Sequence, residues 1–216
     1  MRDQTIEYYQ KRAAEYDKIY YRDNPMRQAE LKDLYGLSQG VLSKLSVLDI
    51  ACGTGFWTRI ISEQAREITG IDINQATLDE AGKKEYNCPV EFIPGDWRKI
   101  PEIDKQFDGL LMTYVLSHVK RQDSDTLRET IKNIIPAGSP AFICDNNLIC
   151  EMEKELIWDK EKINSYKLRK LENGKKYMIL KNYFDNEELL RIFEQWGKVR
   201  RFIFKDYYWA VVLTLE

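Results

Sequence analysis

Short apolar runs and amphipathic stretches alternate along the first 145 residues of the chain. The apolar runs are bounded by polar or turn-forming residues, a pattern that predicts buried strands. They fall at 47–51, 67–74, 90–94, 107–113 and 141–145. The stretches between them repeat apolar residues at helical spacing. Helices are predicted there at 57–66, 75–84 and 123–135. Strands that alternate with helices in this way favour an α/β fold with a doubly wound parallel sheet.

The N-terminal segment predicts helices with an unusual tyrosine content. Residues 3–21 carry apolar positions at helical spacing, but tyrosines make up much of the stripe. Tyrosine suits a surface with one apolar and one wet side, so this segment is either a lid over a ligand or a packing helix. Asn24 followed by Pro25 predicts a helix start. Gly36 is a candidate end for that helix, and a second short piece follows at 37–45.

The C-terminal part departs from the alternation. A charged stretch at 151–162 predicts a helix, and residues 166–180 predict a β-hairpin because Glu-Asn-Gly lies at their centre. Asp185 and Glu188 have the spacing of a capping box, which predicts a helix start. The remaining apolar residues predict two antiparallel strands, at 199–205 and 207–215.

Composition excludes several classes of protein. The 216 residues include 33 Lys and Arg against 35 Asp and Glu, and the pI is about 5.7, unlike the basic footprint of a nucleic-acid binder. Four cysteines without a Cys-x-x-Cys pair indicate reduced thiols, and the single histidine disfavours zinc. The sequence has no apolar stretch of about 18 residues and a charged start, so we expect a soluble cytoplasmic protein without a membrane partner.

The candidate chemistry begins at residues 46–58, which predict a strand, a glycine turn and a helix. Glycines at 53 and 55 let a ligand approach bare backbone at a sheet edge. The dinucleotide fingerprint would need a third glycine where Thr58 stands, and a phosphate-binding loop would need Gly-Lys-Ser/Thr. Asp49 within the strand suits a ligand with positive charge better than a pyrophosphate. A nicotinamide-dependent oxidoreductase is therefore disfavoured.

A second acid follows the next strand. Asp72 lies 17 residues after Gly55. In a βαβ unit this spacing brings a carboxylate to the neighbouring strand end, where it can accept hydrogen bonds from ribose hydroxyls. Asp72 therefore supports a nucleoside site without choosing the cofactor class, and its alternative role is to cap the next helix.

The segment Leu48-Asp49-Ile50-Ala51-Cys52-Gly53-Thr54-Gly55 resembles the first motif of class I S-adenosylmethionine-dependent methyltransferases. Phe107-Asp108-Gly109 resembles the fourth motif, and residues 9–17 resemble the leader of many small members. The resemblance covers roughly residues 8–145 by motif. It implies a seven-stranded, mostly parallel sheet closed by an antiparallel pair, with an N-terminal helical cap and an insertion after the fifth strand.

The resemblance also implies the cofactor, S-adenosyl-L-methionine, with S-adenosyl-L-homocysteine as product. Asp96 matches the acid that contacts the adenine amino group, and Trp97 matches the neighbour that packs on the ring; the alternative for Asp96 is a turn residue. The residues expected to contact the cofactor are Tyr9, Arg12, Tyr16, Asp49, Ala51, Cys52, Gly53, Gly55, Trp57, Asp72, Ile73, Asp96, Trp97 and Thr113.

Residues at the ends of the fourth and fifth predicted strands should face the acceptor, because ligands bind at this edge of such sheets. Candidates for a catalytic base are His118, Tyr114 and Tyr20, with a structural role as the alternative for the histidine. Candidates for substrate contact are Ser117, Asp145 and Asn146; turn residues are the alternative for the last two. No acid cluster follows the fourth strand, so we expect no metal.

We therefore expect one methyltransferase domain over residues 1–216. Its parts are a helical cap (1–45), a cofactor-binding core (46–145), an acceptor-side insertion (146–181) and a C-terminal helix with a strand pair (182–216). The expected reaction is in-line methyl transfer to a small-molecule acceptor. Methylation of protein, peptide or RNA, or cofactor binding without catalysis, are the alternatives. The sequence does not indicate an oligomeric state.

Overall fold

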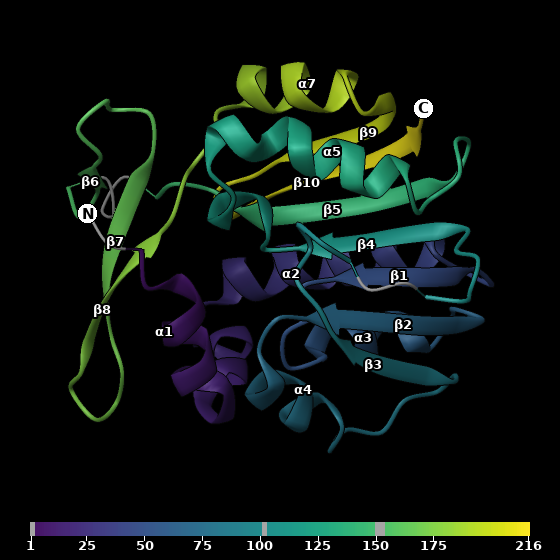
Figure 1. Cartoon of the computed structure of the whole chain (residues 1–216), viewed down its shortest axis with the longest axis horizontal. Helices are drawn as coiled ribbons and strands as arrows, with labels where there is room; N and C mark the ends of the chain where they lie inside the picture. The colour runs from purple at the N-terminus through teal and green to yellow at the C-terminus, as the bar shows by residue number, and fades with distance from the viewer. Residues whose placement is uncertain (1–2, 101–102, 150–153) are drawn as a thin grey trace.

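A seven-stranded sheet organises the computed structural model, which describes residues 3–100, 103–149 and 154–216 (Figure 1). The strand order is β3-β2-β1-β4-β5-β10-β9. The strands are β1 (Ser46–Ile50), β2 (Glu67–Asp72), β3 (Val90–Pro94), β4 (Gly109–Thr113), β5 (Pro140–Asn146), β9 (Gly197–Phe204) and β10 (Tyr208–Leu215). The first five run parallel, whereas β10 is antiparallel to both β5 and β9. The predicted doubly wound sheet with an antiparallel pair is confirmed.

Helices cover both faces of the sheet, so its central strands are buried on both sides. Every residue of β1 and β4 is buried, which explains why these strands are mostly apolar. Successive side chains point to opposite faces, and Val47 and Leu48 accordingly join two separate core clusters. The helices on the Val47 face are α2 (Pro25–Val41) and α3 (Phe56–Ser62); on the Leu48 face they are α5 (Ser124–Lys132) and α7 (Asn186–Glu194) (Figure 1). A shorter helix, α4 (Gln75–Ala81), packs beside β3.

Helix α2 differs from the sequence prediction because it continues through Gly36 and Gly40. Its start is as predicted, since the Asn24 side chain accepts a hydrogen bond from the Arg27 amide at 2.9 Å. Leu31 and Leu34 are buried along one face, and their packing outweighs the weak helix propensity of glycine. Of the separate helical piece expected at 37–45, residues 37–41 are therefore the end of α2, and residues 42–44 form a turn.

Replacing Gly36 or Gly40 by alanine is expected to raise the free energy of unfolding by about 0.5–1 kcal/mol each. A Cβ atom at either position would meet no other atom within 4 Å, and neither glycine has a positive φ. The gain comes from the smaller conformational freedom of alanine in the unfolded chain. Urea unfolding measures it, and a loss of stability in both variants would contradict this account of α2.

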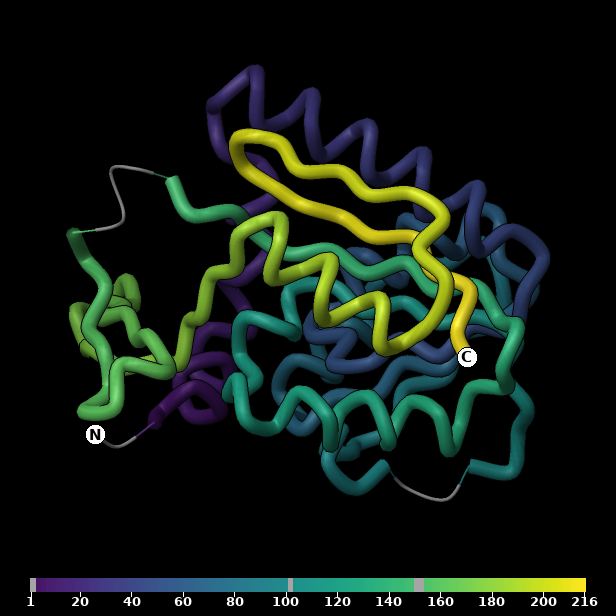
Figure 2. The backbone as a smooth tube through the Cα atoms, turned by 90° about the horizontal axis from the view of Figure 1, so that it is seen from above, coloured from purple at the N-terminus to yellow at the C-terminus, as the bar shows by residue number. Residues whose placement is uncertain are grey.

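The N-terminal segment and the insertion after β5 form one structure, which we call the lid. It consists of α1 (Thr5–Arg12), the 3-10 helix η1 (Ala13–Tyr21) and a small sheet of β6 (Ile157–Trp158), β7 (Ser165–Lys170) and β8 (Lys176–Leu180). The Gln4 amide donates to the Met178 carbonyl at 2.9 Å, and the Tyr8 and Tyr177 rings lie 5.8 Å apart. Both views show this small sheet beside α1, at the end of the main sheet toward which the parallel strands point (Figures 1 and 2).

The helix expected at 151–162 is wrong for the part of it that the structure describes; residues 151–153 lie outside the described ranges. Ile157 and Trp158 form β6, which pairs with β7. The Asp159 carboxylate accepts hydrogen bonds from the amides of Ile163 and Asn164, at 2.8 and 3.0 Å. Local bonds of this kind compete with helix formation, and the charged pattern did not reveal them. The predicted hairpin of β7 and β8 is confirmed.

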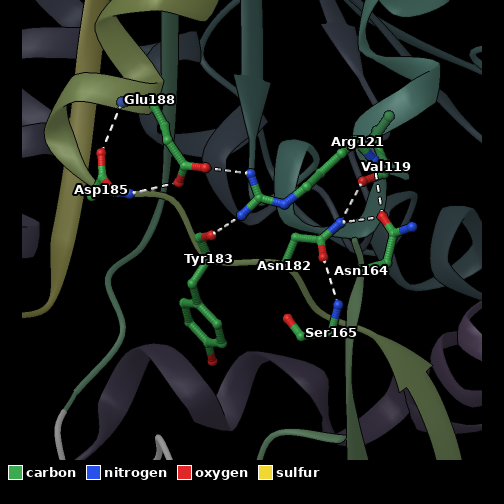
Figure 3. A network of polar contacts seen from close by, with 8 residues as sticks. All are labelled: Val119, Arg121, Asn164, Ser165, Asn182, Tyr183, Asp185 and Glu188. Atoms are coloured by element: carbon green, nitrogen blue, oxygen red, sulfur yellow. Dashed lines mark hydrogen bonds and ion pairs between the residues drawn. The ribbon is translucent and has the colours of Figure 1, made fainter. Parts of the chain in front are cut away.

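A polar network fixes the small sheet to the main body of the protein (Figure 3). Asn182 donates to the Val119 carbonyl at 3.0 Å and accepts from the Ser165 amide at 2.9 Å. Arg121 pairs with Glu188 at 2.8 Å, and Glu188 also completes the predicted capping box of α7. Two short 3-10 helices, η2 (Leu116–His118) and η3 (Arg121–Asp123), supply the core side of these contacts. In the ranges that the structure describes, every helix is too short or too polar to span a membrane.

Candidate functional site

The turn after β1 is held open by left-handed backbone. Ala51, Gly53 and Gly55 have φ of 53°, 56° and 72°. For Ala51 this conformation is strained, and strain of this kind concentrates at functional sites. The Cys52 amide donates to the Ile71 carbonyl at 2.9 Å, which joins the turn to β2. The turn therefore presents bare backbone at the end of two neighbouring strands.

Asp72, the last residue of β2, lies against this turn. Its carboxylate accepts hydrogen bonds from the amides of Gly53 and Asn74, at 2.9 and 2.8 Å, and from the Thr77 hydroxyl at 3.1 Å. Burial raises the pKa of Asp72, while these three donors oppose that rise. A carboxylate offers about four lone-pair positions, so Asp72 keeps capacity for a ligand donor.

Tyrosines of the lid close the site from the other side. Tyr9 and Tyr16 come from the N-terminal segment, with their rings 5.6 Å apart. The Tyr20 ring stacks on the Phe56 ring, with 3.7 Å between the ring centroids. Tyr114 follows β4 with a φ of 58°, a second strained position beside the site. These rings form an aromatic cover over the strand ends.

His118 holds the Tyr9 hydroxyl. The His118 Nδ1 atom lies 2.6 Å from the Leu180 carbonyl, which can only accept, so Nδ1 carries the proton. The Nε2 atom lies 2.8 Å from the Tyr9 hydroxyl and accepts a hydrogen bond from it. Burial, and after it the Lys181 ammonium, lowers the pKa of His118 to about 3. The imidazole is therefore neutral at physiological pH.

Stability should depend on pH through His118. Its pKa is about 3 in the folded chain against an ordinary value of 6.5. Its contribution is therefore fully present above pH 6.5 and is lost as the pH falls from there toward 3. When the pH is lowered from 8 to 5, the free energy of unfolding of the native chain should fall by about 1–2 kcal/mol more than that of the His118→Gln variant. Urea unfolding at both pH values measures this, and equal losses would contradict the assignment.

Two cavities meet at these residues. The first, which we call the strand-end cavity, has a volume of about 450 Å³ and lies over the carboxyl ends of β1, β2 and β4. The second, which we call the lid cavity, has a volume of about 540 Å³ and lies between the lid and α2. Tyr9, Tyr16, Tyr114 and His118 line both. The strand-end cavity is at the edge where sheets of this kind bind their ligands.

Known proteins share this arrangement. A family model described as a methyltransferase domain matches residues 47–138. The solved structure titled "DhpI-SAM-HEP complex" superposes with a TM-score of 0.76 and 25% identity over 95% of this chain and 94% of that one. Residues 47–138 form a methyltransferase domain, and the fold is that of the class I S-adenosylmethionine-dependent methyltransferases.

Curated relatives match the core of this class I methyltransferase. The cypemycin N-terminal methyltransferase of Streptomyces sp is 28% identical over 102 residues, 46% of this chain and 41% of that protein. The ubiquinone biosynthesis O-methyltransferase of Rickettsia bellii (strain OSU 85-389) is 29% identical over 122 residues, 56% of this chain and 50% of that protein. The chain thus spans half or less of the length of these relatives.

Most residues that the sequence singled out lie together in the methyltransferase's strand-end cavity. Those that line it are Tyr9, Tyr16, Tyr20, Ala51, Cys52, Gly53, Trp57, Asp72, Ile73, Asp96, Trp97, Thr113, Tyr114 and His118. Asp96 also pairs with Arg98 at 2.5 Å, a partner that the sequence analysis did not foresee. Their roles toward cofactor or acceptor stay predictions.

Other predicted site residues lie elsewhere. Asp49 is fully buried below the turn. Its carboxylate accepts a hydrogen bond from the Thr58 hydroxyl at 2.6 Å, and burial raises its pKa to about 7. Gly55 faces the Tyr86 side chain and Ala81, so its missing Cβ allows α4 to pack closely. Neither residue lines the strand-end cavity.

The acceptor-side predictions divide between a cavity wall and a buried network. Ser117 and Asp145 are fully buried and are joined by Lys181, whose ammonium lies 2.7 Å from the hydroxyl and 3.1 Å from the carboxylate. Neither lines either cavity. Asn146 lines the lid cavity, and so does Arg12, which was expected to contact the cofactor but does not line the strand-end cavity.

Sequence reasoning missed residues that tie the lid to the turn. The Asp17 carboxylate accepts a hydrogen bond from the Thr54 hydroxyl at 2.5 Å and forms an ion pair with the Lys84 ammonium at 2.9 Å. Asn74 and Thr77 also line the strand-end cavity. Thr77 could have been found from its place in the first turn of the helix after Asp72. In the part of the chain that the structure describes, no group of three or more His, Cys, Asp or Glu side chains could hold a metal ion. The expected absence of a metal itself stays a prediction.

Proposed function

We propose that this chain binds S-adenosylmethionine in the strand-end cavity and transfers the methyl group to a small-molecule acceptor in the lid cavity. The observation that carries this proposal is the contact between the two cavities, which share a wall of Tyr9, Tyr16, Tyr114 and His118. Methyl transfer needs the donor and the acceptor to meet in line, and two cavities that meet at one wall provide for this.

The residues of the strand-end cavity fit this cofactor. Asp72 offers a carboxylate for the ribose hydroxyls, as in other nucleoside sites of this type. A Cβ on Gly53 would meet no protein atom within 4 Å, so the backbone there borders open space that the cofactor can fill. Asp96 supplies a second carboxylate on the same wall, and Trp97 an aromatic face.

When bound, S-adenosylmethionine would supply a methyl group on a sulfonium sulfur: the acceptor's lone pair forms a bond to the methyl carbon, the carbon–sulfur bond breaks, and its electron pair stays on the sulfur. The protein's task is then to align the acceptor and exclude water. Burial raises the pKa of Tyr16 to about 12 and raises the pKa values of Tyr20 and Tyr114 as well. These hydroxyls keep their protons at neutral pH and can donate hydrogen bonds.

A strong protein base is not expected in this reaction. The neutral His118 ring already accepts a hydrogen bond from the Tyr9 hydroxyl, and its low pKa makes it a weak proton acceptor. We therefore assign His118 the role of positioning Tyr9. The acceptor atom should reach the site with a free lone pair, or lose its proton to water.

A labelling experiment tests the acceptor class. The chain is incubated with methyl-tritiated S-adenosylmethionine and a bacterial cell extract, which is then separated by size. We expect the label in the small-molecule fraction, because the lid covers the site. Label in protein, peptide or RNA would favour a macromolecular acceptor, to which the cypemycin relative's name also points. No transfer by a chain that binds the cofactor would favour a binding protein.

A further inference from the structure

The lid cavity has a strongly basic wall. Six cationic side chains line it: Arg12, Arg22, Arg27, Arg169, Lys170 and Lys181. Among the residues that the structure describes, the only carboxylate on this wall is that of Glu155, which pairs with Lys167 at 3.3 Å. The strand-end cavity instead carries carboxylates, among them Asp72 and Asp96. The two cavities therefore differ in the sign of their charge.

None of the four arginines of this wall has a counter-charge. Within residues 3–100, 103–149 and 154–216, no carboxylate lies at ion-pair distance from any of their guanidinium groups. Arg121 shows the contrast, because its guanidinium pairs with Glu188 and donates to the Tyr183 carbonyl (Figure 3). Guanidinium groups have donors in a fork that matches carboxylate and phosphate, so unpaired arginines in a cavity are suited to an anion.

Arg27 is the most informative of the four. Only 8% of its surface is exposed. Its Nε atom donates to the Tyr208 hydroxyl at 2.8 Å, and its guanidinium lies 5.1 and 5.4 Å from the Tyr207 and Tyr208 rings. These neutral partners leave the charge without compensation. A buried charge is costly unless it is paired, and a bound anion would supply the pair.

The cations of this wall also act on one another. Burial, and after it the charges of Arg27 and Arg169, lower the pKa of Arg22. Asp145 does not neutralise these charges, because its carboxylate is already paired with Lys181. The lid hairpin and α2 thus hold like charges together around one cavity, against their repulsion.

We propose that the methyl acceptor of this enzyme is an anion, with a carboxylate or phosphate-type group held by Arg22, Arg27 and Arg169. This inference rests on the proposed function, because it assigns the occupant of the lid cavity. The anionic group lies at the arginines, and the atom that receives the methyl group faces the shared wall of Tyr9, Tyr114 and His118. Opposite charges on the two cavities then suit a cationic donor and an anionic acceptor.

Anion binding to the full chain tests this proposal. Inorganic phosphate and benzoate are titrated separately into the chain saturated with S-adenosylhomocysteine, by calorimetry at low salt. We expect at least one to bind below about 10 mM. The double variant Arg22→Gln/Arg169→Gln should weaken that binding roughly tenfold or more, because each charge-assisted hydrogen bond contributes strongly. The double variant Arg200→Gln/Arg201→Gln, on exposed positions of β9, removes the same charge and should not.

The outcomes separate this proposal from the proposed function. Affinity for S-adenosylhomocysteine should be the same in the native chain and both variants, which also shows that each is folded. Binding of phosphate alone indicates a phosphate-type acceptor, and binding of benzoate alone a carboxylate. If S-adenosylhomocysteine binds but neither anion does, or both double variants weaken the anion equally, the acceptor proposal is overturned and the proposed function stands. If S-adenosylhomocysteine does not bind, the proposed function itself fails.

Discussion

Replacing Asp145 by asparagine is expected to lower the free energy of unfolding by about 3–5 kcal/mol. The Lys181 ammonium, nearly inaccessible to solvent, would then have only neutral partners, such as the Ser117 hydroxyl at 2.7 Å. Burial tends to raise the pKa of Asp145, but the Lys181 charge and the smaller effects of its other neighbours, among them the Ser117 and Asn146 amides, together outweigh it and the pKa is lowered. The carboxylate is therefore ionised in the folded chain, and its loss leaves a buried cation unpaired. Urea unfolding measures the change.

An exposed ion pair provides the control for this variant. Lys105 and Glu91 lie 2.7 Å apart with side chains 37% and 53% exposed. Glu91→Gln should cost less than about 1 kcal/mol, as is usual for surface pairs. The double variant Asp145→Asn/Lys181→Met removes both buried charges and should recover part of the lost stability. Equal costs for Asp145→Asn and Glu91→Gln would contradict a buried ion pair.

Replacing Asp72 by alanine is expected to weaken S-adenosylmethionine binding by about 1–3 kcal/mol, or roughly five- to 150-fold. The carboxylate should accept from the ribose hydroxyls, which would be left without a partner. The same change removes a negative charge from a cavity that takes a cation. Isothermal calorimetry on the purified chain measures the affinity.

Two further variants isolate the carboxylate effect. Asp72→Asn keeps the size of the side chain and an acceptor for the loop amides, and should still lose affinity. Asp79→Asn makes the same charge change on the exposed face of α4 and should bind as the native chain does. Native affinity in Asp72→Asn would remove the residue from the site.

The sequence was sufficient for the central sheet because its strands obey local rules. The central parallel strands β1 and β4 are mostly apolar, as burial on both faces requires. The glycine turn and Asp72 could be assigned to one edge because parallel strands end together. The capping box of α7 was found from two residues, Asp185 and Glu188, whose bonds are local.

The remaining features depend on tertiary contacts that no local pattern carries. Gly36 suggested a helix end, but packing of Leu31 and Leu34 continues α2 beyond it. The charged residues at 154–162 resembled an exposed helix, whereas β6 forms by pairing with β7. Asp145 ended a predicted strand, as a ligand contact would, and only the structure reveals that its carboxylate pairs with Lys181.

A crystal structure of the chain with S-adenosylhomocysteine tests the account most directly. We predict that the ribose hydroxyls lie within hydrogen-bond distance of the Asp72 carboxylate, with the adenine beside Asp96 and Trp97 and the sulfur facing the wall of Tyr9 and Tyr114. A ligand bound away from the strand-end cavity, or a ribose turned away from Asp72, would contradict the account.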